Sequence, residues 1–364
     1  MKRIEQVIIL GAGASKSEGA PLQKELFEEF FKDQSIFEDI KKNDPKTWKN
    51  IWNLVEEQER LIKDFFNDFW GIDVIKYNTK IDFPTFEECL GTLDLANLQG
   101  QSFKGYDKEI INKTRNALIF IIAHHLDNGK LREVNHRKLI DRLKSKKTLK
   151  KTAFISLNYD IIIDNILTDL DIDFHIDYGI DFVNFRRVDD WLPPDPEKSV
   201  LLLKLHGSLN WLYCTTCNHI ELFPKENCSI KLFFKNHKEI CKDCQTPMKF
   251  VIIPPTFYKE MSNPFIQQIF LKADEILRQA DRICICGYSF PDADIHIKYL
   301  LKRAEIFRGE TPEIYVMNNH EFKTDTQKQE EELRFIRFFK NKDKIHYYKN
   351  KSFQDFVKEG IDIK

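Results

Sequence analysis

The sequence has no hydrophobic run long enough to cross a membrane. Its longest apolar stretches, such as Ala117–Ala123, fall far short of the roughly 20 residues that a spanning helix needs. The first residues, Met1–Gln6, include an acid and lack the apolar stretch and small-residue cleavage site of a signal peptide. We therefore expect a soluble, cytoplasmic protein without a membrane partner.

Glycine, proline and net charge are also low. With 13 glycines and 13 prolines in 364 residues, collagen-like and low-complexity proteins are excluded. The 56 basic and 57 acidic residues leave a net charge of -1, so the charge gives no direct signal for nucleic-acid binding. The hydrophobic fraction of 42% is sufficient for a full core. At about 150 residues per domain, the length fits one large or two ordinary domains.

The eight cysteines are unevenly spread, and five of them lie between residues 214 and 244. A disulfide framework is not expected in a cytosolic chain of this length. Four of the five form two Cys-x-x-Cys pairs, which together can supply the four ligands of a tetrahedral zinc site. The 23 residues between the pairs are slightly more than the roughly 15–20 that are usual. These predicted ligands are Cys214, Cys217, Cys241 and Cys244.

Four protein ligands would leave no open position for a catalytic water, so the pattern favours a closed, structural zinc site. Three other residues between the pairs, His219, Cys228 and His237, could replace one ligand. The alternative to a metal site is a set of four unrelated thiols.

Short apolar runs, each ending in small or polar residues, predict the strands of an α/β fold. Between the first two runs, about residues 22–150, the apolar spacing is helical. We expect a Rossmann-like, mostly parallel sheet with a helical insertion, and ligands at the carboxyl ends of the strands. The predicted strands are Gln6–Leu10, Ala153–Leu157, Leu201–Leu205, Ile283–Cys286 and Ile314–Met317.

The first predicted strand passes directly into the small residues Gly11–Ser15. Such a turn lets backbone N–H groups approach a phosphate, and the helix that follows favours negative charge. The position three residues after Gly13 is Lys16, so a full Gly-x-Gly-x-x-Gly motif is absent. A tight strand-to-helix turn without a ligand is the other interpretation.

Polar side chains also follow the second and third predicted strands. Asn158 and Asp160 come after the second, where they could face a cleft or form an Asx turn. His206 follows the third, between Leu205 and Gly207. Its ordinary pKa suits a general base, although it could equally be a histidine satisfied by backbone hydrogen bonds.

The order of these motifs resembles the sirtuin family, and more closely the bacterial sirtuin-like proteins of antiphage defence. The most specific parts are Lys204–Ser208, followed closely by Cys214, and Gly11–Ser15. The resemblance implies one NAD-binding domain over residues 1–364, with the helical insertion and a zinc module at about 212–250. Residues 321–364 would form a tail packed on that domain.

The resemblance also implies roles for individual residues. Asn158 would position the attacking water, and His206 would be the base that acts at the ribose. The remaining predicted positions would contact the NAD phosphates, riboses or carboxamide: Gly11, Ala12, Gly13, Ser15, Asp160, Gly287, Ser289 and Asn318.

Three departures from the deacylating sirtuins bear on the substrate. Deacylating sirtuins carry Gln before the residue that corresponds to Asn158, where this chain has Leu157. They also carry Asp-Phe-Arg where this chain reads Leu22-Gln23-Lys24. Their peptide-clamping strand corresponds here to Phe250–Thr256, in which Pro254 and Pro255 cannot donate ladder hydrogen bonds.

This pattern favours cleavage of NAD by water, giving nicotinamide and ADP-ribose, in an antiphage effector that acts by NAD depletion. NAD would be the substrate and zinc a structural ion. A homo-oligomer or a regulatory protein partner would control the activity. The alternatives are an NAD-dependent deacylase, an ADP-ribosyl transferase, or a non-catalytic sensor of NAD or ADP-ribose.

Overall fold

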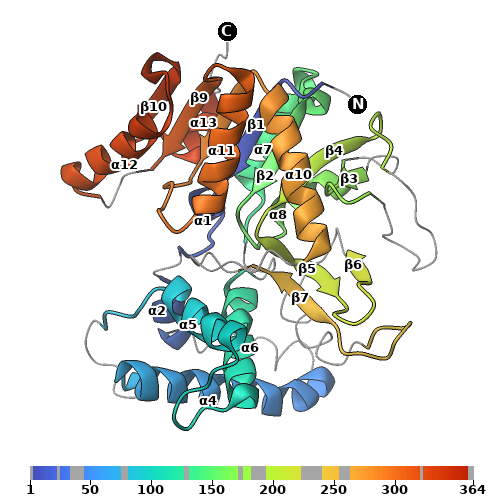
Figure 1. Cartoon of the computed structure of the whole chain (residues 1–364), viewed down its shortest axis with the longest axis vertical. Helices are drawn as coiled ribbons and strands as arrows, with labels where there is room; N and C mark the ends of the chain where they lie inside the picture. Colours follow the sequence, from blue (N-terminus) through green and yellow to red (C-terminus); the bar gives the residue numbers. More distant parts are fainter. Residues whose placement is uncertain are drawn as a thin grey trace.

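The computed structural model describes most of the chain, and it contains a large sheet, a helical unit and a small sheet (Figure 1). The described residues are 3–22, 25–32, 45–74, 81–126, 131–170, 175–181, 194–222, 240–253, 263–319 and 323–359. Among them, no helix is long and apolar enough to cross a membrane.

Seven parallel strands form the large sheet in the order β10-β9-β8-β1-β2-β4-β3. The central strands are almost fully buried, as expected of parallel strands covered on both faces. The strands are β1 (Gln6–Leu10), β2 (Thr152–Ser156), β3 (His175–Asp177), β4 (Ser199–Lys204), β8 (Arg282–Cys286), β9 (Glu313–Asn318) and β10 (Ile345–Lys349).

All five predicted strands are present, and the predicted α/β fold with a parallel sheet is confirmed. Among the strands of the large sheet, the sequence analysis missed β3 and β10. β3 has only three residues, and β10 is a half-buried edge strand that lacks a continuous apolar run. Both signals are too weak to separate from loop sequence.

Helices cover both faces of the large sheet. On one face, at the front in Figure 1, α10 packs against α11. On the other face, α7 contacts both α8 and α13. The helices around the sheet are α1 (Ala12–Lys16), α7 (Val134–Ser145), α8 (Ile162–Thr168), α10 (Pro264–Gln279), α11 (Ile295–Arg308), α12 (Asp325–Phe338) and α13 (Phe353–Glu359), with short 3-10 turns at Leu149–Lys151 and Lys342–Lys344.

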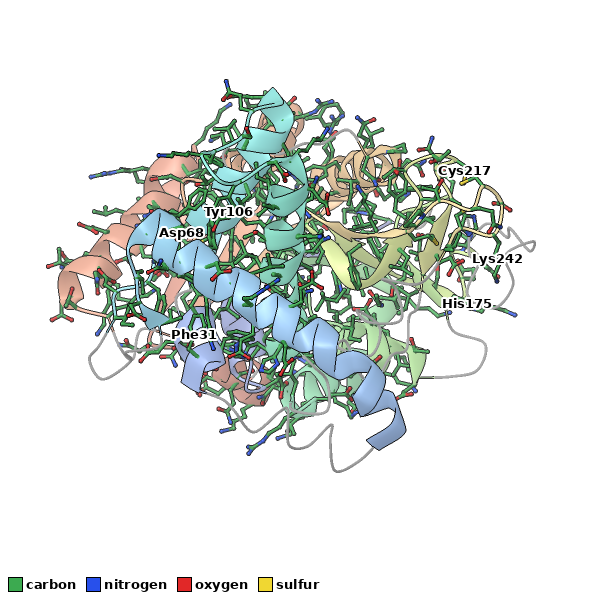
Figure 2. The ribbon with its side chains drawn as sticks, turned by 90° about the horizontal axis from the view of Figure 1, so that it is seen from below. Phe31, Asp68, Tyr106, His175, Cys217 and Lys242 are labelled. Carbon is green, nitrogen blue, oxygen red and sulfur yellow. The ribbon has the colours of Figure 1, made fainter. Side chains whose placement is uncertain are left out.

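The helical unit lies beyond the carboxyl ends of the strands, below the large sheet in Figure 1. Its helices α2, α4 and α5 all contact α6, whose buried apolar run spans residues 117–123. Phenylalanine rings fill the centre, as in the edge-to-face pair of Phe27 and Phe66. Figure 2 views this unit from below, with α4 crossing the molecule. The bounds are α2 (Leu26–Lys32), α4 (Pro45–Trp70), α5 (Phe86–Gln99) and α6 (Lys108–His125).

The small sheet is antiparallel, with the strand order β6-β5-β7. Its strand β5 begins at the residue after His206, so this sheet grows directly out of the carboxyl edge of the large one. The sheet therefore places the four-cysteine segment beside that edge. The strands are β5 (Gly207–Tyr213), β6 (Ile220–Leu222) and β7 (Lys249–Ile252).

Candidate functional site

The turn after β1 and the turn after β8 touch through their backbones. The N–H of Gly13 donates to the carbonyl oxygen of Gly287 at 2.8 Å. Gly287 has φ +65°, and a Cβ built there would lie 2.2 Å from the nitrogen of Ala14. Only glycine can therefore occupy this position without moving the turn. The contact lies where the strand order reverses, which is where open α/β sheets bind ligands.

The turn after β2 brings Asn158 against this glycine-rich turn. The side-chain Nδ2 of Asn158 donates to the carbonyl oxygen of Gly11 at 2.9 Å and to Ser15 Oγ at 2.8 Å. An amide group has two N–H donors, so these two bonds use both. The amide oxygen Oδ1 is therefore the atom of this half-buried side chain that could accept a hydrogen bond from a water.

Asp160 lies beneath Asn158 and is buried. It accepts a hydrogen bond from Ser15 Oγ at 2.6 Å and one from the backbone N–H of Ile162 at 3.2 Å. Its backbone carbonyl accepts from the Lys204 ammonium at 2.5 Å. Asp160 therefore joins the ends of β1, β2 and β4 rather than facing the solvent side of the crevice.

The network continues below Asp160 through a fully buried ion pair. Lys204 Nζ lies 3.0 Å from Asp164 Oδ2, and both side chains have no exposed surface. Asp164 Oδ1 also accepts from Tyr178 OH at 2.5 Å and from Asn210 Nδ2 at 3.2 Å. A buried charge is tolerated when it is paired and hydrogen-bonded in this way. These bonds fix the residues directly before His206.

His206 is buried at the corner between β4 and β5. Its Nδ1 lies 3.0 Å from the carbonyl oxygen of Leu157, the residue before Asn158. Because a carbonyl can only accept, Nδ1 carries the proton and Nε2 keeps the lone pair in the neutral ring. Nε2 faces the start of α11, where it lies 2.9 Å from His296 Nε2 and 3.8 Å from Asp294 Oδ1.

The other predicted binding residues have different surroundings. Ala12 and Ser289 are exposed, and Ser289 lies in the turn after β8. Asn318, at the end of β9, is buried and its Nδ2 donates to the Tyr288 carbonyl at 2.9 Å and to Glu331 Oε1 at 2.6 Å. In this conformation Asn318 therefore fixes the turn after β8 from below.

Sequence reasoning missed two polar residues at this edge, Asp294 and His296. Asp294 is the residue that precedes α11, and His296 is the second residue of that helix. The alternation of Asp292, Asp294 and His296 just after a buried strand was the available signal. Their position opposite His206 depends on the packing of α11.

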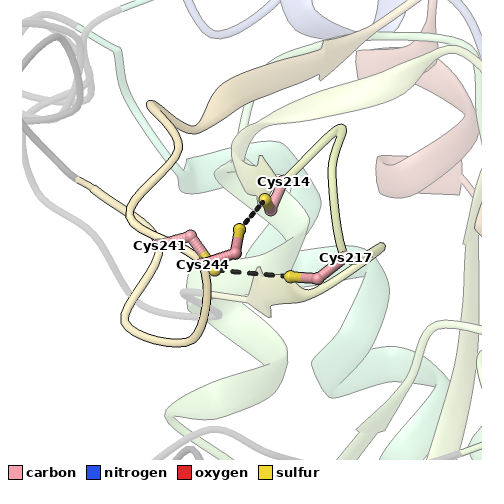
Figure 3. Close-up of side chains that lie close together, drawn as sticks. All are labelled: Cys214, Cys217, Cys241 and Cys244. Carbon is pink, nitrogen blue, oxygen red and sulfur yellow. Dashed lines mark hydrogen bonds between the residues drawn. The ribbon is translucent and has the colours of Figure 1, made fainter.

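The four cysteine side chains predicted as zinc ligands converge beside the small sheet (Figure 3). Cys214 Sγ lies 3.3 Å from Cys244 Sγ, and Cys217 Sγ lies 3.4 Å from Cys241 Sγ. All four sulfurs lie within 4.8 Å of one another, and all four residues are free thiols. The two pairs thus come together as the spacing predicted.

This arrangement fits a zinc ion. With Zn–S bonds of about 2.3 Å, tetrahedral sulfurs lie about 3.8 Å apart, and the observed separations range from 3.3 Å to no more than 4.8 Å. The thiols of the cluster share protons unequally. A hydrogen bond with the Thr246 side chain lowers the pKa of Cys244 to about 6. A backbone hydrogen bond from His219 lowers the pKa of Cys217, but desolvation and the neighbouring thiols outweigh it and raise that pKa to about 12. Of the three alternative ligands, His219 lies beside Glu221 and Asp243. The other two alternative ligands, Cys228 and His237, are outside the described residues. The same holds for positions that bear on a peptide substrate: Gln23, Lys24 and Pro254–Thr256.

Solved structures of sirtuins resemble the chain at low identity. "Crystal structure of Sir2 in complex with the inhibitor EX-527, 2'-O-acetyl-ADP-ribose and deacetylated p53-peptide" is 13% identical, with a TM-score of 0.39, and covers 98% of this chain and 91% of that one. "The Structural basis of Sirtuin Substrate Affinity" is 12% identical, with a TM-score of 0.42, and covers 98% of this chain and 93% of that one. "Sir2-p53 peptide-NAD+" is 14% identical, with a TM-score of 0.41, and covers 98% of this chain and 92% of that one. At these scores the likeness carries no argument about function.

Among curated proteins, none matches the chain. A family match is found, however, to the SIR2-like domain over residues 152–347. This range is 196 of the 364 residues and runs from the start of β2 into β10, so it includes Asn158, His206 and the four cysteines. The chain therefore belongs to the SIR2-like domain family.

Proposed function

We propose that this protein is an NAD glycohydrolase that cleaves NAD with water to nicotinamide and ADP-ribose. The observation that carries the proposal is the convergence of Asn158 and His206 beside the glycine-rich turn. Their side chains come from the ends of β2 and β4, and they are linked through Leu157, whose carbonyl accepts from the His206 ring. The family assignment is the reason for choosing NAD as the substrate.

The hydrogen bonds of the two residues suit the roles proposed for them. Because both N–H groups of Asn158 are used, its Oδ1 can orient a water molecule by accepting a hydrogen bond. Because His206 donates through Nδ1, its Nε2 can act as a base toward a ribose hydroxyl. A ribose there would replace the His296 contact at Nε2.

The reaction requires little else from the protein. Breaking the bond between nicotinamide and ribose builds positive charge at the anomeric carbon, as in glycoside hydrolysis. Nicotinamide leaves as a neutral molecule, so no strong acid is needed. A positioned water, a group that contacts the ribose hydroxyls and a water-poor pocket are sufficient.

The strand that would clamp a peptide substrate supports water as the acceptor. The N–H of Ile253, just after β7, donates to the carbonyl oxygen of His206 at 2.9 Å. The carbonyl of Ile253 accepts from Tyr159 OH at 2.8 Å. An added peptide strand would need such backbone groups for its own ladder. At this position both are already used within the protein.

The proposed biological role is NAD depletion in antiphage defence, and it rests on the resemblance to bacterial sirtuin-like effectors. Such an activity must be restrained until infection, because unrestrained cleavage would empty the cell of NAD. A second copy of the chain or a regulatory protein could supply that restraint. The helical unit, which lies next to the crevice, is the proposed contact region. The four-cysteine site holds structural zinc in this proposal.

Nicotinamide release from NAD by the purified protein, without any peptide, tests the proposal. We expect release by the wild type and its loss in Asn158→Asp and His206→Gln, which change the chemistry with little change in volume. His175→Ala, at an exposed histidine on β3, is the matched control and should keep the wild-type rate.

Two results would contradict hydrolysis with water as acceptor. Nicotinamide release that requires an acyl-lysine peptide or another protein acceptor would indicate a deacylase or an ADP-ribosyl transferase. Stoichiometric binding of NAD in calorimetry, with no release by the wild type either alone or in lysate of infected cells, would indicate a sensor.

A further inference from the structure

Three side chains that could bind a metal ion converge at the crevice, away from the four cysteines. They are His206, Asp294 and His296, and one ligand atom of each lies within 4.8 Å of the others. The two imidazole Nε2 atoms are 2.9 Å apart, and Asp294 Oδ1 lies 3.8 Å from Nε2 of His206. His206 and Asp294 are buried, and His296 is half-buried.

We propose that these three residues form a second metal site, which binds a divalent transition-metal ion of the Zn²⁺ class. Two imidazoles and one carboxylate are the donor set of many three-ligand zinc sites. The nitrogen and oxygen donors distinguish this site from the four-thiolate cluster, which prefers softer ions. The two sites can therefore be filled and measured separately.

The bonds around His206 match those of a metal-binding histidine. Metal-bound histidines commonly donate their other ring N–H to a backbone carbonyl or a carboxylate. In this protein Nδ1 of His206 lies 3.0 Å from the Leu157 carbonyl oxygen. The lone pair of Nε2 is consequently directed toward Asp294 and His296. Without an ion, a proton between the two Nε2 atoms accounts for their short separation.

Asp294 is supported by a second hydrogen bond. The hydroxyl of Tyr288 donates to Asp294 Oδ2 at 2.8 Å, whereas Oδ1 is the oxygen nearer to His206. This hydrogen bond from Tyr288 orients the carboxylate, as outer residues do in metal sites.

The observed spacing requires only small movements to accept an ion. With Zn–N bonds of about 2.0 Å, two nitrogen ligands at the tetrahedral angle lie about 3.3 Å apart. The two histidine nitrogens would separate, and Asp294 would approach, by a few tenths of an ångström each. The charge of Asp294 offsets the positive end of α11, which by itself disfavours a cation.

Occupation of this site would switch off the activity proposed above, and this consequence rests on that proposed function. An ion bound to His206 Nε2 uses the lone pair with which the ring would act at the ribose. The ion would also stand between His206 and the place that a ribose hydroxyl must reach. With three protein ligands, a tetrahedral zinc ion keeps one coordination position for water.

Metal binding is measured first, on protein whose four-cysteine site already holds one Zn²⁺ per chain. Calorimetry with added Zn²⁺ should show one further ion per chain. Cobalt added to the same protein should give weak d–d absorption without the intense bands of thiolate ligation. We expect His296→Ala to bind the second ion at least about 100-fold more weakly, and Tyr288→Phe about 10-fold more weakly. The control His175→Ala should bind as the wild type does.

Nicotinamide release with and without Zn²⁺ is measured second. The ion should suppress release by the wild type, and His296→Ala should show the same rate with and without it. The inference is overturned if no second ion binds, or if His296→Ala binds it as tightly as the wild type. If the second ion binds as expected and no condition yields nicotinamide, the metal site stands and the proposed hydrolase activity fails.

Discussion

The crevice of the large sheet and the four-cysteine segment of the small sheet are organised by different means. At the crevice, buried strands support a connected set of hydrogen bonds, and its central pair, Lys204 and Asp164, has no exposed surface. The cysteines lie on a sheet of three short strands, with a separate hydrophobic cluster formed only by Leu212, Cys214, Cys241 and Met248 among its buried residues. The first site is stabilised by the fold, whereas we expect the second to depend on a metal ion.

The largest expected effect tests the metal dependence of the small sheet. In Cys214→Ser the site loses a thiolate ligand, and structural zinc supplies about 10 kcal/mol or more to the folding of small metal modules. We expect zinc to be lost and the segment around residues 212–250 to become sensitive to protease. Metal content and limited proteolysis measure this.

Cys89→Ala is the matched control, because Cys89 is a buried thiol in the helical unit. The Cys89→Ala protein should keep its zinc, and its small sheet should remain resistant to protease. A Cys214→Ser protein that is free of metal and yet protease-resistant would show that the two regions are stabilised alike.

The second prediction breaks the buried ion pair under the crevice. Lys204→Met leaves the Asp164 carboxylate buried without its cation, which costs about 3–5 kcal/mol. Denaturant unfolding should show this loss. Lys151→Met removes a pair of similar length, 2.8 Å to Glu5, that is about half exposed. It should change the free energy of unfolding by less than about 1 kcal/mol. Equal losses in the free energy of unfolding for the two variants would show that burial of the ion pair does not matter for stability.

The third prediction concerns the contact between the turns after β1 and β8. In Gly287→Ala the new Cβ would meet the nitrogen of Ala14, in addition to the strain of a positive φ. We expect a loss of about 2–4 kcal/mol and of NAD binding. Gly309→Ala, with φ +78° and open space around its Cβ, isolates the strain and should cost about 1 kcal/mol. Thermal unfolding and calorimetry compare the two.

The smallest effect is a pH dependence at the junction of the crevice and the helices. Glu18 is buried, which raises its pKa, but hydrogen bonds from His136 and the N–H of Asn135 outweigh this, and the net pKa is lowered from 4.5. The ionised carboxylate therefore stabilises the folded state above about pH 4.5, and this contribution is lost as the pH falls through the lower, folded-state pKa.

Glu18→Gln tests this directly. The variant should be less stable than the wild type by about 1 kcal/mol at pH 7, and the difference should shrink as the solution is acidified. Denaturant unfolding at a series of pH values measures it. A difference that stays constant down to the acid limit would contradict the assignment.

The strands of the large sheet were predictable because each is a short apolar run between small or polar residues. Gln6–Leu10 is β1 without any change of bounds, and the others differ by one or two residues. The polar residues at their carboxyl ends were therefore predicted as neighbours. The edge strand β10 was not predicted, because it is only half-buried and its sequence has no apolar run.

The sequence by itself determined the parallel sheet, the glycine-rich turn, and the four cysteines as one group, since these follow from local periodicity and spacing. Only the tertiary structure decided which polar residues share the crevice. Asp160 and Asn318 are used in buried hydrogen bonds, while His296 reaches His206 from 90 residues away. Contacts over such separations depend on how helices pack on the sheet, and a local pattern of residues carries no record of that packing.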